Sequence, residues 1–281
     1  MVSMKAVDSP IRDIIKYILG PFKGSNFYSY LQAWSMSRDI KAGRFIEPEI
    51  ELLPYAVKKG EVVLDVGANY GLYTYYLSKL VGESGEVIAF EPIPFTYRTL
   101  LKVLNIFSLK NISAHMLAVS DKDGVDKFKI PLQAAGHLMA GQAYLGSRED
   151  QHGDVVSQVR WSEITEIECE TIALDNCDFI NKPISFIKLD IEGAEIFALE
   201  GARKIICTDL PTLIMEINPW FLEGFSKNIE QLINPLVQIG YKVYRYENKS
   251  LLEIKNIQSI VEENYVFIHS NKLSRFEELI K

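Results

Sequence analysis

The sequence predicts one α/β domain, with a parallel sheet covered by helices on both faces. Short apolar runs rich in β-branched residues alternate with helical patterns along the chain, and glycine ends several of these segments. The chain has 281 residues, of which 48% are hydrophobic and 24% charged. This composition permits a full core and excludes a disordered, collagen-like or disulfide-stapled chain. The length alone would also permit two small domains, but the alternation favours one.

Residues 1–45 precede the alternation, and we expect them to form a helical extension of a domain that covers residues 46–281. Five apolar residues of the extension have the spacing of an amphipathic helix: Ile11, Ile14, Ile15, Ile18 and Leu19. This helix either packs on its own domain, the commoner arrangement, or contacts a membrane surface or a partner such as a second copy of the chain. A further helix is predicted over 48–58, before Gly60.

The sheet and its helices are predicted from the runs that follow. Strands are expected over residues 61–66, 86–90, 112–119, 184–189, 211–217, 241–246 and 264–269. Helices are expected over residues 72–80, 94–107, 193–206 and 226–239. Because crossover helices return the chain to the same edge of a sheet, this order predicts parallel neighbours.

One segment breaks the alternation. Two further strands are predicted over 125–131 and 166–174, and the stretch between them has no clear periodicity. It holds four glycines together with His137 and His152. Long irregular segments inside compact domains are usually functional or disordered. We interpret residues 132–164 as an inserted lid near the substrate.

The charge and the cysteine content narrow the class of protein. The net charge is -7, so the chain lacks the basic excess that drives nucleic-acid binding, and we expect no nucleic-acid partner. No apolar run approaches the ~20 residues that cross a bilayer. No signal-peptide pattern opens the chain, so a cytoplasmic location is expected. The three cysteines lack a CxxC pair, which favours buried free thiols over a zinc site.

A glycine loop follows the first predicted strand. Residues 65–71 read Asp-Val-Gly-Ala-Asn-Tyr-Gly, and Gly67 and Gly71 permit a tight turn and close approach of a ligand. The next helix presents free N–H groups to the same ligand. Glu91 ends the following strand, where its carboxylate can accept both hydroxyls of a ribose. The segment therefore predicts a nucleoside site at the carboxyl ends of the strands.

The spacing of the loop favours S-adenosylmethionine over a nicotinamide dinucleotide. The G-x-x-x-G pattern lacks the third glycine of the dinucleotide fingerprint. Asp65 would repel a pyrophosphate, whereas it suits an ammonium group, directly or through water. Two alternatives stay open: Asp65 only caps backbone amides of the loop, and Glu91 is a surface acid. A nicotinamide-dependent oxidoreductase is the rival function.

A second acidic motif, Lys-Leu-Asp-Ile-Glu-Gly-Ala-Glu, occupies residues 188–195. It closes one predicted strand and opens a helix, so Asp190 and Glu192 project near the same crevice. A carboxylate at the end of a buried strand needs a partner or a function. Glu195 falls in the first helical turn, where it either stabilises the helix dipole or has a functional role.

These two motifs, together with Phe90-Glu91-Pro92 and Ala118-Val119-Ser120-Asp121, resemble the FkbM family of S-adenosylmethionine-dependent methyltransferases. The resemblance runs from about residue 45 to residue 270. It implies a class I, Rossmann-like methyltransferase fold with a seven-stranded, mostly parallel sheet whose last strand is antiparallel. It also implies transfer to an oxygen, as in sugars and polyketides, or less often to an amide nitrogen of a peptide.

The resemblance also implies roles for individual residues. Gly67, Asn69 and Gly71 would form the cofactor loop, Glu91 would bind the ribose, and Asp190 would lie beside the methionine part. Ala118, Val119 and Ser120 would border the adenine. The full predicted cofactor set is Asp65, Gly67, Asn69, Tyr70, Gly71, Glu91, Pro92, Ala118, Val119, Ser120 and Asp190.

Transfer to a hydroxyl benefits from a general base. The candidates are His137 of the lid, which titrates near neutral pH, and the acids Asp190 and Glu192. His137 is otherwise an exposed lid residue. Asp190 and Glu192 could instead hold a divalent metal, although two carboxylates are few for such a site. The acceptor is expected to be a small molecule, a glycan or a peptide. Glu216 is a candidate for the acceptor side, and Trp220 is expected in the core.

Overall fold

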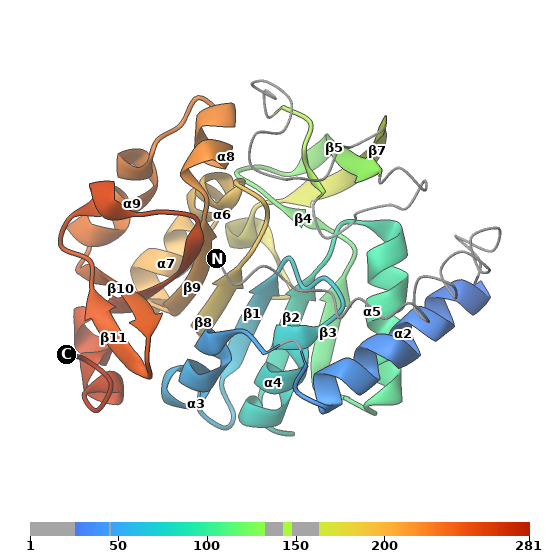
Figure 1. Cartoon of the computed structure of the whole chain (residues 1–281), viewed down its shortest axis with the longest axis horizontal. Coiled ribbons are helices and arrows are strands. Elements are labelled where there is room, and N and C mark those ends of the chain that lie inside the picture. The colour runs from blue at the N-terminus through green and yellow to red at the C-terminus, as the bar shows by residue number, and fades with distance from the viewer. Residues whose placement is uncertain (1–25, 45, 133–142, 148–162) are drawn as a thin grey trace.

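The computed structural model describes residues 26–44, 46–132, 143–147 and 163–281. Within them, the main sheet has eight strands in the order β11-β10-β12-β9-β8-β1-β2-β3 (Figure 1). The strands are β1 Val62–Val66, β2 Glu86–Phe90, β3 Ile112–His115, β8 Ile184–Leu189, β9 Thr212–Ile217, β10 Tyr241–Glu247, β11 Ser250–Glu253 and β12 Glu263–His269. Each core strand of the prediction is therefore present.

The strand directions match the predicted class of fold. Strands β3, β2, β1, β8 and β9 run parallel, and β12 is antiparallel to both β9 and β10. The antiparallel last strand is thus confirmed. The described sheet has eight strands where seven were predicted, because the chain turns back after β10. Asn248 and Lys249, with φ of 50° and 59°, form a two-residue hairpin loop that adds β11 at the edge.

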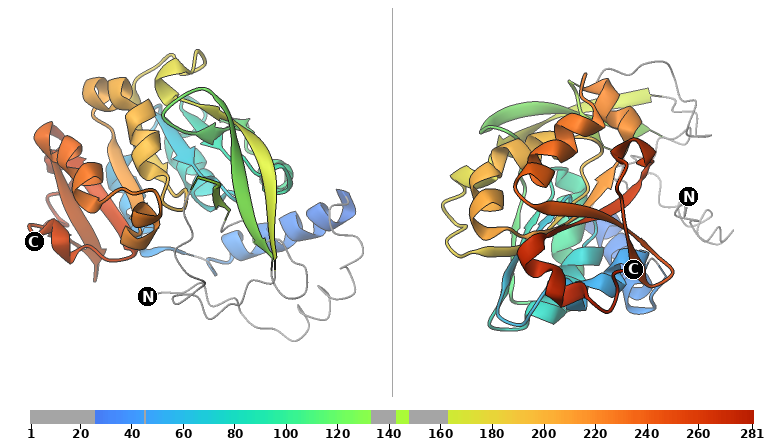
Figure 2. Two further views of the ribbon diagram at one scale, coloured as in Figure 1. Left: turned by 90° about the horizontal axis from the view of Figure 1, so that it is seen from above. Right: turned by 90° about the vertical axis from the view of Figure 1, so that its left-hand side faces the viewer.

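Helices cover both faces of the sheet (Figure 2). One face carries η2 Pro48–Leu52, α3 Leu53–Ala56, α4 Leu72–Val81, α5 Pro94–Ile106 and η6 Ser270–Phe276. The other carries α6 Glu195–Gly201, α7 Arg203–Asp209 and α9 Ile229–Gln238. The remaining short helices are η4 Leu174–Asn176, α8 Pro219–Gly224 and η5 Ile257–Ser259.

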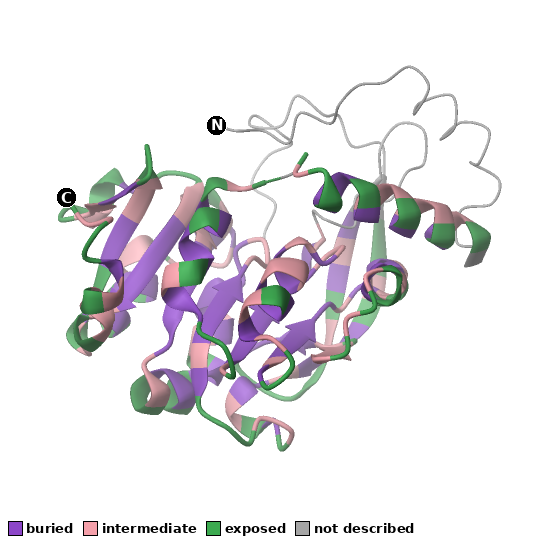
Figure 3. Cartoon of the chain, turned by 90° about the horizontal axis from the view of Figure 1, so that it is seen from below, coloured by how far each residue is buried: buried purple, intermediate pink, exposed green. Residues whose placement is uncertain are grey.

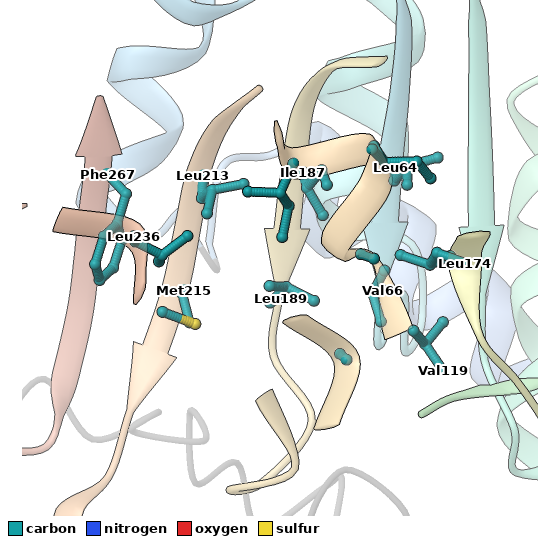
Figure 4. Packing of buried hydrophobic residues seen from close by; sticks show 14 of the residues in the cluster. Leu64, Val66, Val119, Leu174, Ile187, Leu189, Leu213, Met215, Leu236 and Phe267 are labelled. Carbon is teal, nitrogen blue, oxygen red and sulfur yellow. The ribbon is translucent and has the colours of Figure 1, made fainter. Parts of the chain in front are cut away.

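The core lies between these layers, and the central strands are buried along most of their length (Figure 3). Side chains alternate along β1, so that Val63 packs under α3 and α4 while Leu64 and Val66 face the α6, α7 and α9 side. On that second side Leu213 and Met215 of β9 meet helix α9 (Figure 4). The β-branched runs were therefore correctly interpreted as buried parallel strands.

Three predicted elements are divided in the structure. The strand expected over 112–119 ends at His115, and Ala118–Val119 forms β4 in a separate sheet. The helix expected over 193–206 is broken into α6 and α7, where Gly201 approaches the carbonyl oxygen of Ser120 so closely that a Cβ would lie 2.0 Å from it. The helix expected over 48–58 is a 3₁₀ turn followed by one α-helical turn.

The second sheet forms the base of the predicted insert. Within the described residues its order is β4-β7-β5-β6, with β5 Gly124–Leu132, β6 Tyr144–Leu145 and β7 Glu163–Ile172. Strands β5 and β7 are an antiparallel pair from Gly124↔Thr171 to Leu132↔Glu163, which confirms the two extra strands. Most of the insert, His137 and His152 included, lies outside the described residues, so the lid stays a prediction.

Helix α2 Asn26–Lys41 is the described part of the predicted extension, and it packs against α5. Ala33 and Ile40 contact Val103 of α5, and the Lys102 side chain donates a hydrogen bond to Ser29. The amphipathic helix predicted over 11–19 lies outside the described residues. No helix in the described ranges combines the length and the apolar character needed to cross a membrane. Cys169 and Cys177 are buried free thiols as predicted, whereas Cys207 is exposed.

We expect Leu213→Ala to lower the free energy of unfolding by about 2–5 kcal/mol, because it removes a fully buried side chain from the centre of β9. Urea denaturation measures this change. The matched control is Leu101→Ala, at an exposed position of α5, which should change stability by less than about 1 kcal/mol. Equal losses from both variants would contradict the assigned core.

Candidate active site

The candidate site lies where the chain reverses its direction of travel across the sheet. From β1 the chain proceeds to β2 and β3 on one side, whereas β8 and β9 lie on the other. The carboxyl ends of β1 and β8 therefore flank a topological switch point, the place where open α/β sheets bind ligands. Residues 67–71, Glu91 and residues 190–195 all follow strands at this edge.

The glycine loop after β1 has the conformation its sequence predicted. Gly67 and Gly71 have φ of 81° and 86°, and Asn69 adopts φ of 48°. A Cβ on Gly67 would lie 2.0 Å from the carbonyl oxygen of Asp190, so only glycine fits here. The amides of Gly67 and Ala68 donate to the Phe90 carbonyl at 3.0 and 2.9 Å. The loop is therefore fixed between β2 and the segment after β8.

Glu91 is buried and held in one orientation by the backbone. Its Oε2 accepts a hydrogen bond from the Asn69 amide at 3.0 Å, and its Oε1 accepts one from the Ile93 amide at 2.9 Å. Burial raises its pKa to about 7 despite these bonds. The surface-acid alternative is therefore wrong. Pro92 lies beside Glu91, and its carbonyl accepts from the Cys169 thiol.

Asp65, at the start of the loop, and Tyr70, within it, are each held by a hydrogen bond to a neighbouring element. Asp65 is 1% exposed, and the Thr74 hydroxyl donates to its Oδ2 at 2.5 Å. Burial raises the pKa of Asp65 to about 6. Burial likewise raises the pKa of Tyr70 to about 12, and its hydroxyl is hydrogen-bonded by Gln32 of α2. The predicted extension therefore reaches the cofactor loop, a contact that the sequence did not predict.

The turn after β8 brings the second motif against the loop. The Asp190 amide donates to the Val66 carbonyl at 3.1 Å, and its side chain is 36% exposed. Glu192 and Gly193 both have positive φ, 57° and 96°, and turn the chain into α6. The two predicted acids thus lie at the edge where the ligand is expected.

Glu195 has the structural role that was one of its two alternatives. Its side chain is 2% exposed, and its Oε1 accepts from the Ile191 amide at 2.9 Å. Burial raises its pKa to about 7, although the backbone amides of Ile191, Glu195 and Gly193 oppose this shift. The carboxylate therefore fastens the turn that carries Asp190 and Glu192.

Lys188 is the central residue that sequence reasoning missed. It is 1% exposed, and its Nζ lies 2.8 Å from Asn264 Oδ1 and 3.5 Å from Asp190 Oδ2. The ring of Tyr73 lies 4.9 Å from the same Nζ. Burial alone would lower the pKa of Lys188, but the surrounding acids, Asp190 foremost, raise it. The signal was available: a lysine inside the apolar run Ile-Ser-Phe-Ile-Lys-Leu must have a buried partner.

The network continues from Lys188 in two directions. Asn264 donates to Glu47 at 3.3 Å, which also accepts the Tyr73 hydroxyl at 2.8 Å. Towards the site, Glu216 at the end of β9 lies beside Asp190, because β8 and β9 pair in register up to Leu189↔Met215. The charge of Asp190, then burial and Glu192, raise the pKa of Glu216 strongly. Glu216 thus lies at the carboxyl ends of the strands, as its position suggested. We call the group of acids at these strand ends the acidic edge: Asp65, Glu91, Asp190, Glu192, Glu195 and Glu216.

The structure also gives the positions of the residues predicted to border the adenine and of Trp220. Ala118, Val119 and Ser120 are buried, and the Ser120 amide donates to Ile172 at 2.9 Å. Their place beside the adenine stays a prediction. Trp220 was expected in the core but is 36% exposed, because α8 lies beyond the end of β9 with this residue in its first turn.

The residues present fit S-adenosylmethionine. Asn69 Oδ1 is buried in the loop and has no hydrogen-bond partner in the described part of the chain, so it is available to a ligand. Glu91 retains lone pairs on both oxygens for ribose hydroxyls. Among the described residues, no group of three or more His, Cys, Asp or Glu side chains is placed to hold a metal. The metal considered for Asp190 and Glu192 therefore gains no support there.

We expect Gly67→Ala to abolish cofactor binding, because the added methyl would collide with the Asp190 carbonyl and φ of 81° strains an L residue. Calorimetry with S-adenosylmethionine measures the loss. Gly124→Ala is the control, since its Cβ would meet only Thr171 Oγ1 at 3.7 Å. Retained affinity in Gly67→Ala would contradict the assigned contact.

The stability of the cofactor-free protein should fall as the pH rises from about 4.5 to about 7. The unfolded chain ionises Glu195 near the ordinary pKa of 4.5, whereas the fold keeps it protonated until about 7. The folded state thus binds more protons in this window, at a cost on the order of 3 kcal/mol above it. Urea denaturation across pH should show a shallower decline for Glu195→Gln. Exposed Glu200→Gln on the same helix should retain the parent decline; a parent-like profile for Glu195→Gln would refute the assignment.

Comparisons with known proteins agree with this site. A family model described as the methyltransferase FkbM domain matches residues 65–243. Methyltransferase 1 of Beauveria bassiana (strain ARSEF 2860) is 22% identical over 165 residues, which are 56% of this chain and 64% of that protein.

Two solved structures are also similar. Methyltransferase FkbM from Methylobacillus flagellatus KT has 18% identity and a TM-score of 0.46, covering 75% of this chain and 44% of that one. A SAM-dependent methyltransferase from Aquifex aeolicus has 17% identity and a TM-score of 0.41, covering 83% of this chain and 96% of that one. The chain spans less than two thirds of the Beauveria and Methylobacillus proteins.

The family match covers both motifs, from Asp65 in β1 to Val243 in β10. It confirms the resemblance that the motifs carried and leaves the nicotinamide-dependent alternative without support. Because the match covers more than half of the chain, the chain belongs to the FkbM family of methyltransferases, and its cofactor is S-adenosylmethionine.

Proposed function

We propose that this chain transfers a methyl group from S-adenosylmethionine to a hydroxyl oxygen of a sugar or a natural-product acceptor, such as a polyketide or a peptide. The observation that carries the proposal is the position of Asp190. Its backbone carbonyl lies directly against Gly67 of the glycine loop, and its carboxylate is partly exposed there, among acids that are otherwise largely buried. A carboxylate there can accept the proton that a hydroxyl loses on methylation.

The chain's own residues would position the reaction rather than activate the methyl group. When bound, S-adenosylmethionine supplies a methyl carbon already activated by a sulfonium. The 67–71 loop and Glu91 hold the nucleoside side, and Lys188 fixes the Asp190 carboxylate beside it. In-line displacement then depends mainly on alignment and on exclusion of water.

Asp190 and Glu192 remain the candidate bases within the described residues. His137 stays a prediction for the same role, as do the lid, the cytoplasmic location and self-association through residues 11–19. Transfer to a peptide amide nitrogen is the alternative that the acceptor experiment separates from transfer to oxygen.

Incubation with S-adenosylmethionine and a panel of sugar, polyketide and peptide acceptors should yield S-adenosylhomocysteine together with a methyl ether. Mass spectrometry detects the added methyl group, and NMR identifies the atom that carries it. Methyl groups found only on amide nitrogen would overturn the choice of oxygen. Cofactor binding without turnover of any acceptor would favour a non-catalytic binding module.

Glu91→Gln should weaken S-adenosylmethionine binding by about 10- to 100-fold, because a neutral amide loses charge-assisted bonds to the ribose and cannot accept through both ends. Calorimetry measures the dissociation constant. Glu83→Gln, in the exposed turn before β2, serves as the control. Parent-like affinity in Glu91→Gln would remove the ribose assignment.

A further inference from the structure

The carboxyl groups of Asp190 and Glu216 come together at the ends of two adjacent parallel strands. Strands β8 and β9 pair in register as far as Leu189↔Met215, so the next residues on each strand are neighbours. The charge of Asp190 is the first cause that raises the pKa of the Glu216 carboxyl. Two carboxyl groups that share a site repel each other when both are ionised, so one of them keeps its proton and can donate a hydrogen bond to the other.

The surroundings of the pair retain that proton. Acids face it from several elements, and the charge of Lys188 on β8 opposes their effect on Glu216. Lys188 already interacts with Asn264 and Asp190. The other groups that interact with the pair or with Lys188 are Asp65 on β1, Glu91 after β2, Glu192 and Glu195 after β8, Tyr73 on α4, and Glu47 and Glu49 before and in η2.

The same pair adjoins the predicted cofactor position. Asp190 contacts the glycine loop through its carbonyl oxygen, at the point where Gly67 permits no side chain. A cation bound at this loop would thus stand beside the pair. A positive charge within about 4–6 Å favours the ionised form of a carboxyl group by one to three pKa units.

We propose that Asp190 and Glu216 share one proton in the cofactor-free protein, and that binding of cationic S-adenosylmethionine displaces this proton and leaves the pair as the base for the acceptor. This inference rests on the proposed function. In the transfer, the acceptor oxygen forms its bond to the methyl carbon as the carbon–sulfur bond breaks. The electron pair of that bond stays on sulfur, and the hydroxyl proton passes to the pair, which thereby regains its resting state.

The inference has a thermodynamic consequence. Where binding releases one proton, the dissociation constant falls tenfold for each unit by which the pH rises. Conversely, each pH unit lost costs a tenfold increase. Glu216→Gln keeps a hydrogen bond to Asp190 but carries no exchangeable acid proton, so its affinity should change far less with pH.

Calorimetry of S-adenosylmethionine binding in buffers of different ionisation enthalpy counts the protons released. At about pH 8.5, Glu91, Asp65 and Glu195 are largely ionised, because their pKa values are about 7, 6 and 7. A fall of one to three units takes the pKa of Glu216 from about 10 to between about 9 and 7, so we expect the parent to release about 0.2 to 0.9 proton per cofactor more than Glu216→Gln. The α-amino group of the cofactor also titrates near this pH, but it contributes equally to both proteins and cancels in the difference. Glu223→Gln, exposed on neighbouring α8, should match the parent. Equal release from the parent and Glu216→Gln would overturn the proposal.

A second measurement needs no cofactor. The infrared carbonyl band of a protonated carboxyl group should be present in the cofactor-free parent at about pH 8.5 and absent from Glu216→Gln. Its absence from the parent overturns the shared proton. These outcomes separate the two proposals: methylation without proton release refutes only the carboxyl pair, whereas absence of S-adenosylmethionine binding refutes the proposed function together with the displacement step.

Discussion

The contact between Gly67 and the carbonyl oxygen of Asp190 is the constraint on which the candidate site depends. It joins the loop after β1 to the turn after β8, across the switch point of the sheet. The Asp190 amide bonds to Val66 in the same place, so the two turns are fastened from both directions. Neither strand alone defines a site. The carboxyl ends of β1 and β8 form a single site because Gly67, which has no side chain, lets the two backbones meet.

The acidic edge is held in place by one buried cation and by backbone amides. Lys188 joins strands β8 and β12 to Glu47, while Glu91 and Glu195 each fasten a loop by accepting main-chain N–H groups. A buried lysine without such partners would be strongly unfavourable, and the same is true of each carboxylate. The arrangement therefore specifies where each charge lies more than it adds stability. That precision is what alignment of a cofactor and an acceptor requires.

Local patterns predicted the parts of the structure that local physics determines. The run 62–66, the glycine loop and Glu91 were found because a buried strand, a positive φ and a strand-end acid each leave a signature within a few residues. The break of the 112–119 strand was not found, because β4 is drawn to β7 by pairing with residues some fifty positions later. The Lys188 network was missed for the same reason. Its members come from Glu47, α4, β8, β9 and β12, and only folding brings them together.

The raised pKa values at this edge also explain why the site suits a cation. Asp65, Glu91 and Glu216 all hold protons to higher pH than exposed acids do, with burial the first cause for Asp65 and Glu91 and the charge of Asp190 for Glu216. Each shift records a free-energy cost of ionising an acid in the cofactor-free fold: loss of hydration for Asp65 and Glu91, and repulsion by Asp190 for Glu216. A ligand with a sulfonium and an ammonium group returns part of that energy, because it replaces lost hydration with opposite charge. A neutral nucleoside cannot do so. Affinity for the cationic cofactor is thus set partly by how unfavourable these acids are without it.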